Sequence, residues 1–154
     1  MNRLYTPFDI IWIKNVSNSE TGNAYMDIES EEFVLHFPDH HKGNVLSPKI
    51  DEIILLHQNI NNQKMFTHLV TPIDNIILEE NRERYRYGRR VRIIAKTELT
   101  NSVPVSSTLW ERVNFQGISQ GNACKIAKIS KIENYDILLQ DIWDRFIPHF
   151  KIEV

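Results

Sequence analysis

The chain has 154 residues, a formal net charge of −2 and one cysteine, which fits a single globular domain with its own core. A hydrophobic share of 42% and a charged share of 25% exclude collagen-like and disordered chains. The start of the chain lacks the apolar region of a signal peptide, and every apolar run is far below the roughly 20 residues of a membrane helix. Cys124 cannot form an internal disulfide. We therefore expect a cytoplasmic protein that does not insert into membranes.

The first half of the chain alternates short β-branched or aromatic segments with turn-forming residues. Residues 9–14 predict a buried first strand. Residues 27–37 suit a short amphipathic helix, or a strand at their end. Residues 48–58 and 64–72 predict two further strands, and the polar link 59–63 between them favours a hairpin.

A further strand is expected at residues 90–96, directly after an arginine-rich stretch. Because side chains alternate across a strand, Arg90 and Arg92 should share one side, and Val91 and Ile93 the other. The charges would then lie along one edge or one face of the sheet.

The last third of the chain predicts two helices and a strand. Ser106 or Ser107 provides an N-cap for a short helix over residues 106–113. Residues 123–129 predict the last strand. Residues 132–146 carry apolar side chains at helical spacing, which predicts an amphipathic C-terminal helix that ends at Pro148.

These elements favour an α+β fold in one domain spanning residues 1–154. About five short strands leave little room for crossover helices, which argues for a small mixed or antiparallel β-barrel. Flanking helices and the C-terminal amphipathic helix would pack outside it.

Arginine is concentrated in residues 82–92, where six of the nine arginines of the chain lie. A guanidinium is always charged and forks onto phosphate oxygens, so this segment predicts contacts with a nucleic-acid backbone. The phosphate-contacting candidates are Arg82, Arg84, Arg86, Arg89, Arg90 and Arg92. Two alternatives stay open: a solvated face whose charges pair with Glu79, Glu80 and Glu83, or a protein-interaction module that meets an acidic partner.

Several short motifs follow one another in a familiar order. They are Lys14-Asn15 at the end of the first strand, Gly22-Asn23-Ala24-Tyr25-Met26-Asp27, Pro48-Lys49-Ile50-Asp51, Phe66-Thr67-His68-Leu69-Val70, and Gly117-Ile118-Ser119-Gln120-Gly121. Together they resemble the PUA-like superfamily, especially its EVE and YTH branches, with the strand start at Pro48 similar to that of EVE and ASCH domains.

The resemblance implies a β-barrel with a pocket that accepts a single, often modified, base flipped from a strand. Such a pocket needs an aromatic face and groups that both donate and accept hydrogen bonds. Carried over by position, the base-pocket candidates are Lys14, Asn15, Asn18, Asn23, Tyr25, Ser119 and Gln120. For His57, a buried or half-buried pair with His68 across the hairpin is the favoured explanation, and a contact to a base edge is the alternative that adds it to the pocket candidates. The expected partner is DNA or RNA.

Catalytic and metal-binding motifs are weak. Asp39-His40-His41 has ligand chemistry but no further ligand pair at suitable spacing, so we expect neither a metal nor another cofactor. Cys124 has no evident histidine partner, and no nucleophile elbow or phosphate-binding glycine loop occurs. We expect a protein that is not an enzyme. A small hydrolase or nuclease that uses Asp27, Glu29, Glu31 or His57 is the lesser alternative.

Overall fold

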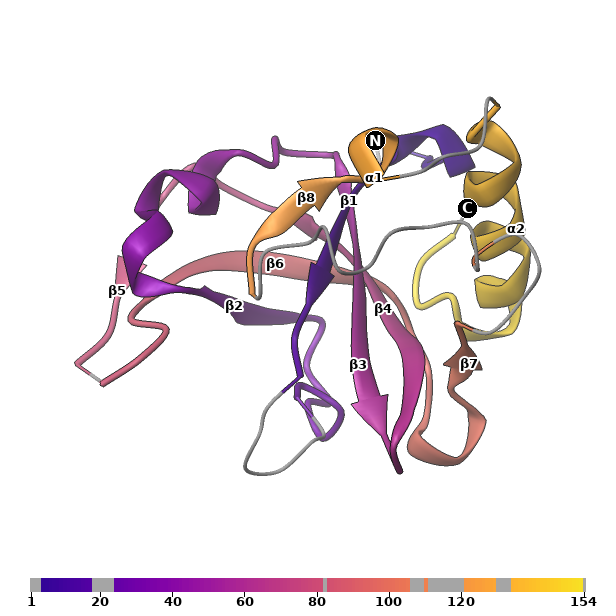
Figure 1. Cartoon of the computed structure of the whole chain (residues 1–154), viewed down its shortest axis with the longest axis horizontal. Coiled ribbons are helices and arrows are strands. Elements are labelled where there is room, and N and C mark those ends of the chain that lie inside the picture. The colour runs from indigo at the N-terminus through magenta and orange to yellow at the C-terminus, as the bar shows by residue number, and fades with distance from the viewer. Residues whose placement is uncertain are drawn as a thin grey trace.

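The structure is a computed structural model that describes residues 4–17, 24–81, 83–105, 110, 121–129 and 134–153 (Figure 1). The backbone of His40 and His41 is included in these ranges, and their side chains are not.

One curled sheet forms the centre of the molecule, with strand order β2-β6-β4-β3-β1-β8. These strands are β1 (Ile10–Asn15), β2 (Glu32–Phe37), β3 (Ile53–Ile60), β4 (Gln63–Pro72), β6 (Tyr87–Lys96) and β8 (Ala123–Lys125). Two short strands lie off this path: β5 (Leu78–Glu79) pairs with β6, and β7 (Val103–Pro104) pairs with β4. The pair β1 and β3 is parallel, and the other pairs are antiparallel. The predicted mixed α+β architecture is confirmed, as a half-barrel with six strands in its main path.

The two faces of the sheet bury separate apolar clusters. The inner cluster receives side chains from all six strands of the main path, among them Trp12, Leu35, Ile54, Val70, Val91 and Ala123. Since six strands converge on it, this cluster fills the concave side of the half-barrel. The outer cluster lies between the convex side and the C-terminal helix, and it contains Ile13, Leu55, Phe66, Leu138 and Phe146.

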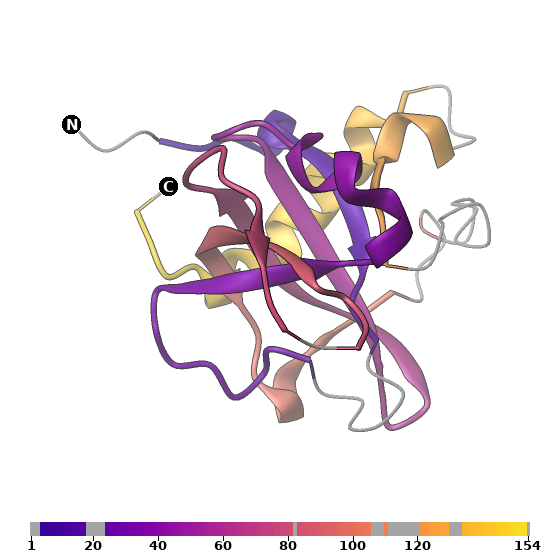
Figure 2. The same ribbon diagram turned by 90° about the vertical axis from the view of Figure 1, so that its left-hand side faces the viewer.

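Helix α2 (Asp136–Phe146) covers the convex side, as Figures 1 and 2 show. The predicted apolar stripe forms its buried face, which consists of Leu138, Leu139, Ile142, Trp143 and Phe146. A 3-10 turn, η6 (Ile147–His149), continues the helix and contains Pro148. The short η1 (Pro7–Asp9) packs against α2 near the start of β1.

One sequence prediction changes, one open alternative is resolved, and one prediction lies outside the described residues. The strand expected at 123–129 ends at Lys125, and α1 (Ile126–Ile129) follows, because a helical turn buries both Ile126 and Ile129 in the outer cluster. Residues 27–37 form β2 at their end rather than a helix. The helix expected at 106–113 lies outside the described residues except for Trp110, which is buried.

The predicted hairpin between β3 and β4 is confirmed. Asn61 and Asn62 occupy its two-residue turn with φ angles of 52° and 65°. Both values lie in the left-handed region, which asparagine tolerates and which a type I′ turn requires at both positions. The turn therefore fixes the register of β3 against β4.

A side chain extends the sheet beyond β8. Asn44 lies in η2 (Asp39–Leu46), the segment that follows β2. Its amide nitrogen donates to the carbonyl of Ala123 at 2.9 Å, and its amide oxygen accepts from the Ala123 N–H at 2.7 Å. Asn44 thus pairs with β8 as a strand residue would and links both ends of the half-barrel.

Candidate functional site

The arginine segment forms the start of β6 and the loop that leads into it. Arg90 and Arg92 are exposed, whereas Val91 and Ile93 are buried in the inner cluster. The predicted alternation along this strand is therefore confirmed. Arg84 and Arg86 are exposed in the preceding loop, and Arg82 lies outside the described residues.

Arg89 differs from its neighbours, because its side chain points inward and is only 1% exposed. Its guanidinium donates to the carbonyls of Val45 (3.1 Å) and Asp74 (2.9 Å), to the carbonyl of Pro48, and to the side-chain oxygen of Asn75 (3.0 Å). The prediction that Arg89 contacts phosphate is wrong for this conformation, because the guanidinium is consumed in joining η2 to the loop after β4.

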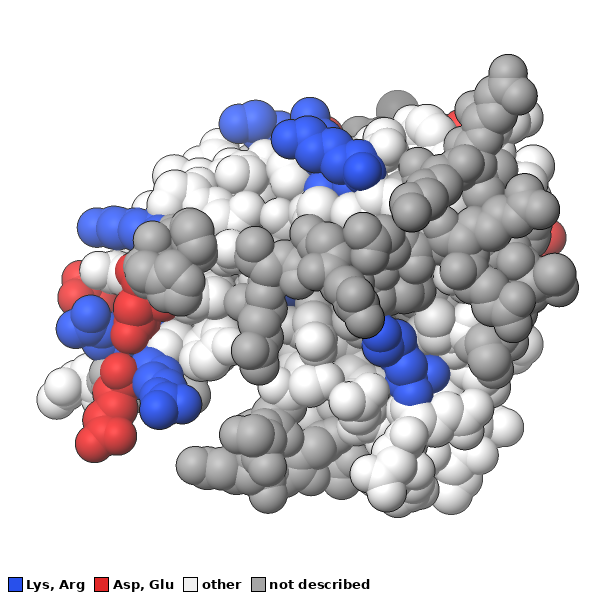
Figure 3. Space-filling view, viewed as in Figure 1, with Lys and Arg blue, Asp and Glu red and all other residues white. Residues whose placement is uncertain are grey.

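Two of the exposed arginines pair with carboxylates. Arg86 Nε lies 3.4 Å from Asp39, and Arg90 Nε lies 3.3 Å from Asp74. Figure 3 shows basic and acidic side chains side by side at the end of the molecule where β5 and β6 lie. This surface is rich in arginine without being uniformly basic.

Lys14 is the most unusual polar residue of the inner side. It is 1% exposed, donates to the carbonyl of Gly121 and lies 4.6 Å from the ring centre of Phe37. Within the described residues no carboxylate pairs with it, and burial lowers the pKa of Lys14 to about 7. A buried amine of this kind has donor capacity left for a further acceptor.

Cross-strand register places Lys14 in a polar row on the concave side. Lys14 pairs with Leu56, Leu56 with His68, and His68 with Lys96, so these side chains share one face of four adjacent strands. Burial lowers the pKa of His68 to about 4, and the charge of Lys96 acts in the same direction. The row therefore holds two amines and one neutral imidazole, with Leu56 between Lys14 and His68.

Hydrogen bonds from this side of the sheet hold the segment of residues 24–28 against the row. Gln58 donates to the carbonyl of Ala24 at 2.8 Å, a ring nitrogen of His68 lies 3.3 Å from the carbonyl of Tyr25, and Lys96 donates to the carbonyl of Ile28 at 2.6 Å. One buried acceptor on this side, Gln58 Oε1, has no hydrogen-bond partner within the described residues. Buried acceptors without partners are rare enough to need an explanation.

The other base-pocket candidates do not all join this row. In the parallel pair of β1 and β3, Asn15 aligns with His57 one position beyond Lys14 and Leu56, so both lie on the opposite face from Lys14. Burial, followed by the charges of Lys64 and Lys14, lowers the pKa of His57 to about 3. The prediction that Asn15 and His57 share one pocket with Lys14 is therefore wrong. Asn18, Asn23, Ser119 and Gln120 lie outside the described residues.

Tyr25 connects the concave side to the free edge of β2. Its ring stacks on Phe33 at a centroid distance of 4.5 Å and meets His68 edge-on at 6.4 Å. Its hydroxyl accepts from the backbone N–H of His36 at 3.0 Å and lies 3.3 Å from His36 Nδ1. His36 Nε2 lies 3.1 Å from Glu80 Oε1. No motif or spacing along the chain pointed to His36 or to this contact.

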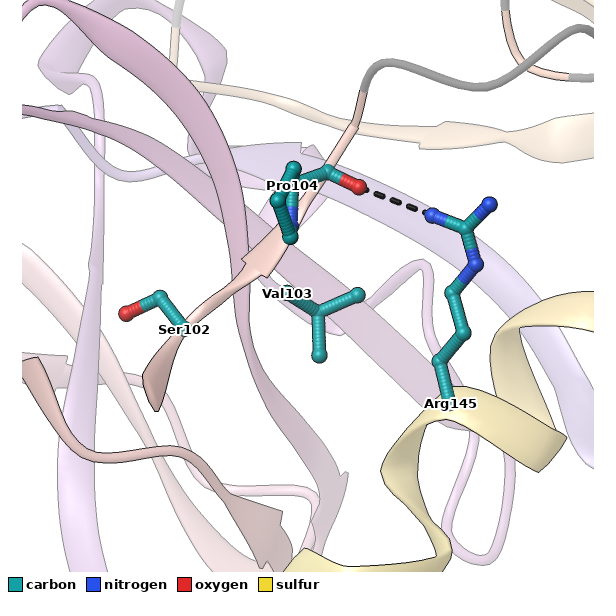
Figure 4. A pocket seen from close by; sticks show the side chains of 4 residues that line it. All are labelled: Ser102, Val103, Pro104 and Arg145. Atoms are coloured by element: carbon teal, nitrogen blue, oxygen red, sulfur yellow. Dashed lines mark hydrogen bonds between the residues drawn. The ribbon is translucent and has the colours of Figure 1, made fainter. Parts of the chain in front are cut away.

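A groove lies on the other side of the molecule. Ser102, Val103, Pro104 and Arg145 line an open hollow of about 430 Å³ between β7 and α2 (Figure 4). Arg145 donates to the Pro104 carbonyl at 2.8 Å and pairs with Asp141 at 3.2 Å. Its guanidinium thus bridges strand and helix.

In the part of the chain that the structure describes, no group of three or more His, Cys, Asp or Glu side chains could hold a metal ion. No helix in those residues has the length and apolarity to cross a membrane. Cys124 is half-buried, and burial raises the pKa of its thiol, which disfavours the thiolate.

Comparison of the chain with protein-family models, with curated proteins and with solved structures finds no match. The resemblance to the PUA-like superfamily therefore stays a prediction from short motifs.

Proposed function

We propose that this chain is a nucleic-acid-binding module that contacts phosphates through the exposed arginines of residues 84–92 and holds a single base on the concave side beside Lys14. One observation carries the proposal. Arg90 and Arg92 project from the same side of one strand with both side chains exposed. An always-charged fork held on a rigid strand suits a phosphate backbone better than a flexible loop does.

The existing ion pairs do not block this role. Exposed pairs such as Arg90 with Asp74 and Arg86 with Asp39 contribute about 0.2–1 kcal/mol each, so a phosphate can displace the carboxylate at small cost. Arg90 and Arg92 are two residues apart, which separates them by roughly 7 Å along the strand. They can therefore contact different phosphates of one nucleic-acid strand.

The concave side supports the second half of the proposal. Lys14 offers a donor, and Gln58 Oε1 offers an acceptor that lacks a partner within the described residues. A base edge presents both donors and acceptors, and Tyr25 and Phe33 supply aromatic surface. Leaving a buried acceptor unpaired costs about 1–3 kcal/mol, which a ligand donor would recover.

A protein-interaction module is the second candidate. The alternation of arginine with Asp39 and Asp74 on one surface is also the pattern of a protein interface that selects a partner by charge. Binding to such a partner would not depend on base identity and would be unaffected by substitution of Lys14.

Fluorescence anisotropy tests the proposal with labelled single- and double-stranded oligonucleotides at several salt concentrations. The variant is the double substitution Arg90→Ala and Arg92→Ala. The matched control, Lys128→Ala and Lys151→Ala, removes the same charge from exposed residues outside the arginine segment.

We expect the arginine variant to lose at least tenfold in affinity and to lower the slope of log affinity against log salt by about 1.4 for single strands, from ~0.7 per phosphate contact. The control should keep both values. Oligonucleotides with methylated or hydroxymethylated bases should reveal a base preference that Lys14→Met removes. Absence of binding at low salt would refute the proposal and favour the protein partner.

A further inference from the structure

Tyr25, His36 and Glu80 form a line of three functional groups that begins at the tyrosine ring of the proposed base site and leads away from it. They come from three separate segments: the turn at 24–27, strand β2, and the residue after β5. The Tyr25 hydroxyl lies 3.3 Å from His36 Nδ1, and His36 Nε2 lies 3.1 Å from Glu80 Oε1. Hydroxyl, imidazole and carboxylate in series are the order of a nucleophile, its general base and the group that orients the base.

The sheet is arranged so that this line crosses over β6. His36 pairs with Gly88 from the β2 side, and Leu78 pairs with the same Gly88 from the β5 side. The contact from His36 to Glu80 therefore passes above residue 88. A Cβ at this position would lie 2.4 Å from Val34 Cγ1 and 3.6 Å from His36 Cδ2. Glycine keeps that passage open.

Tyr25 is held in an uncommon backbone conformation. Its φ of 62° is in the left-handed region, which costs a residue with a side chain free energy and persists where surrounding contacts enforce it. The stacking on Phe33 and the contact of the Tyr25 carbonyl with His68 supply that enforcement. The backbone N–H of His36 also points at the phenol oxygen, so a donor is in place for negative charge that develops there.

We propose that Tyr25 is a nucleophile toward phosphodiesters. The choice of a nucleic-acid strand as the natural substrate rests on the proposed function. His36 Nδ1 takes the proton of the Tyr25 hydroxyl while a bond forms between the phenol oxygen and phosphorus. The bond from phosphorus to the leaving oxygen breaks, and the leaving alkoxide receives the proton from His36. The product is a phosphotyrosyl link to one end of the strand and a free hydroxyl on the other.

The neighbouring charges suit this reaction. Arg90 pairs with Val34, two residues from His36 on the same face of the sheet, where a guanidinium can stabilise a phosphoryl group. The side chain of His36 is 18% exposed and that of Glu80 is 43% exposed, while the Nε2 atom of His36 is buried between them. Glu80 does not touch the reacting atoms and acts as a positioning residue for the imidazole.

The test uses the full chain with two activated phosphodiesters: bis(p-nitrophenyl) phosphate and an oligonucleotide ending in a p-nitrophenyl phosphodiester. Nitrophenolate release is followed by absorbance, and peptide mass spectrometry locates the added mass. We expect a stoichiometric burst with the adduct on Tyr25. Tyr25→Phe should abolish the burst, and His36→Gln should slow it by 10²–10⁴-fold, the usual contribution of a general base.

Two further variants complete the test. Glu80→Gln should slow the burst about tenfold and displace its pH profile, which loss of a merely structural contact would not do. Tyr87→Phe, a half-buried tyrosine of β6, is the control and should react as wild type does.

The outcomes separate this inference from the proposed function. A burst with the small ester in a chain that binds no oligonucleotide keeps the nucleophile and refutes nucleic-acid binding. Normal oligonucleotide binding without an adduct from either ester refutes the nucleophile alone. An adduct that persists in Tyr25→Phe also refutes it, and the Tyr25 hydroxyl then serves only to cap the free edge of β2.

Discussion

Arg89 and Arg90 are adjacent in sequence and occupy opposite environments. Arg89 is 1% exposed and is surrounded by carbonyl oxygens, whereas the side chain of Arg90 is 50% exposed and forms a surface ion pair with Asp74 at 3.3 Å. Strand alternation alone separates them, because successive side chains of β6 point to opposite faces. The arginines of one strand therefore divide into buried and exposed side chains, and only the exposed ones are available to a ligand.

The largest effect on stability is expected when the buried Arg89 is replaced. In Arg89→Met, the carbonyls of Val45, Pro48 and Asp74 lose their donor, and each buried carbonyl left unpaired costs about 1–3 kcal/mol. We expect a loss of roughly 3–5 kcal/mol in the free energy of unfolding, measured by urea denaturation. A loss below about 1 kcal/mol would show that Arg89 is not a structural residue.

The second buried cation gives a pH-dependent effect. The pKa of Lys14 is about 7 in the fold and 10.5 in the unfolded chain, so between these values the unfolded state binds more protons. Stability from this group should rise with pH by up to about 1.4 kcal/mol per unit from pH 7 toward 10.5. Urea denaturation at pH 7, 8 and 9 should reveal this rise in wild type and its absence in Lys14→Met. Parallel curves for the two proteins would contradict it.

The buried histidines act in the acid range. The pKa of His57 is about 3 and that of His68 about 4, against an unfolded value of 6.5. Below pH 6.5 these two histidines bind protons in the unfolded chain but stay neutral in the folded chain. The free energy of unfolding therefore falls as the pH drops from 6.5 to about 4. His68→Gln should reduce this fall by up to about 1.4 kcal/mol per pH unit, measured by thermal unfolding at pH 6.5, 5.5 and 4.5. The same acid slope in both proteins would assign the loss to other groups.

The smallest effect on stability should come from the outer arginine. Arg90→Ala removes one exposed ion pair, with Asp74, and should change the free energy of unfolding by less than about 1 kcal/mol. Measured in the same urea series as Arg89→Met, it supplies the matched control for position and charge. Equal losses in the two variants would remove the distinction between inner and outer arginines.

Much of the fold follows from local patterns. The alternation that puts Arg90 and Arg92 outside also puts Arg89 inside, because Arg89 shares its parity with Val91 and Ile93. The hairpin and the buried stripe of α2 were likewise readable from turn residues and helical spacing. The strand expected at 123–129 was misjudged at its end, because short apolar runs do not distinguish a strand from a helical turn.

The candidate sites depend on register, which the sequence does not contain. Lys14 and His57 both looked suited to one pocket, and only the parallel pairing of β1 with β3 assigns them to opposite faces. His36 and Glu80 are brought together because β2 and β5 both pair with Gly88, from its two sides. Such a meeting of distant segments leaves no spacing signal along the chain.

The amide of Asn44 also bears on how the protein behaves at high concentration. Its two hydrogen bonds to Ala123 occupy backbone groups that would otherwise invite a strand from another molecule. One side chain thereby prevents edge-to-edge pairing of β8 with a strand of another copy. Asn44→Leu would expose that margin of β8, and self-association would become the chief liability of an otherwise folded domain.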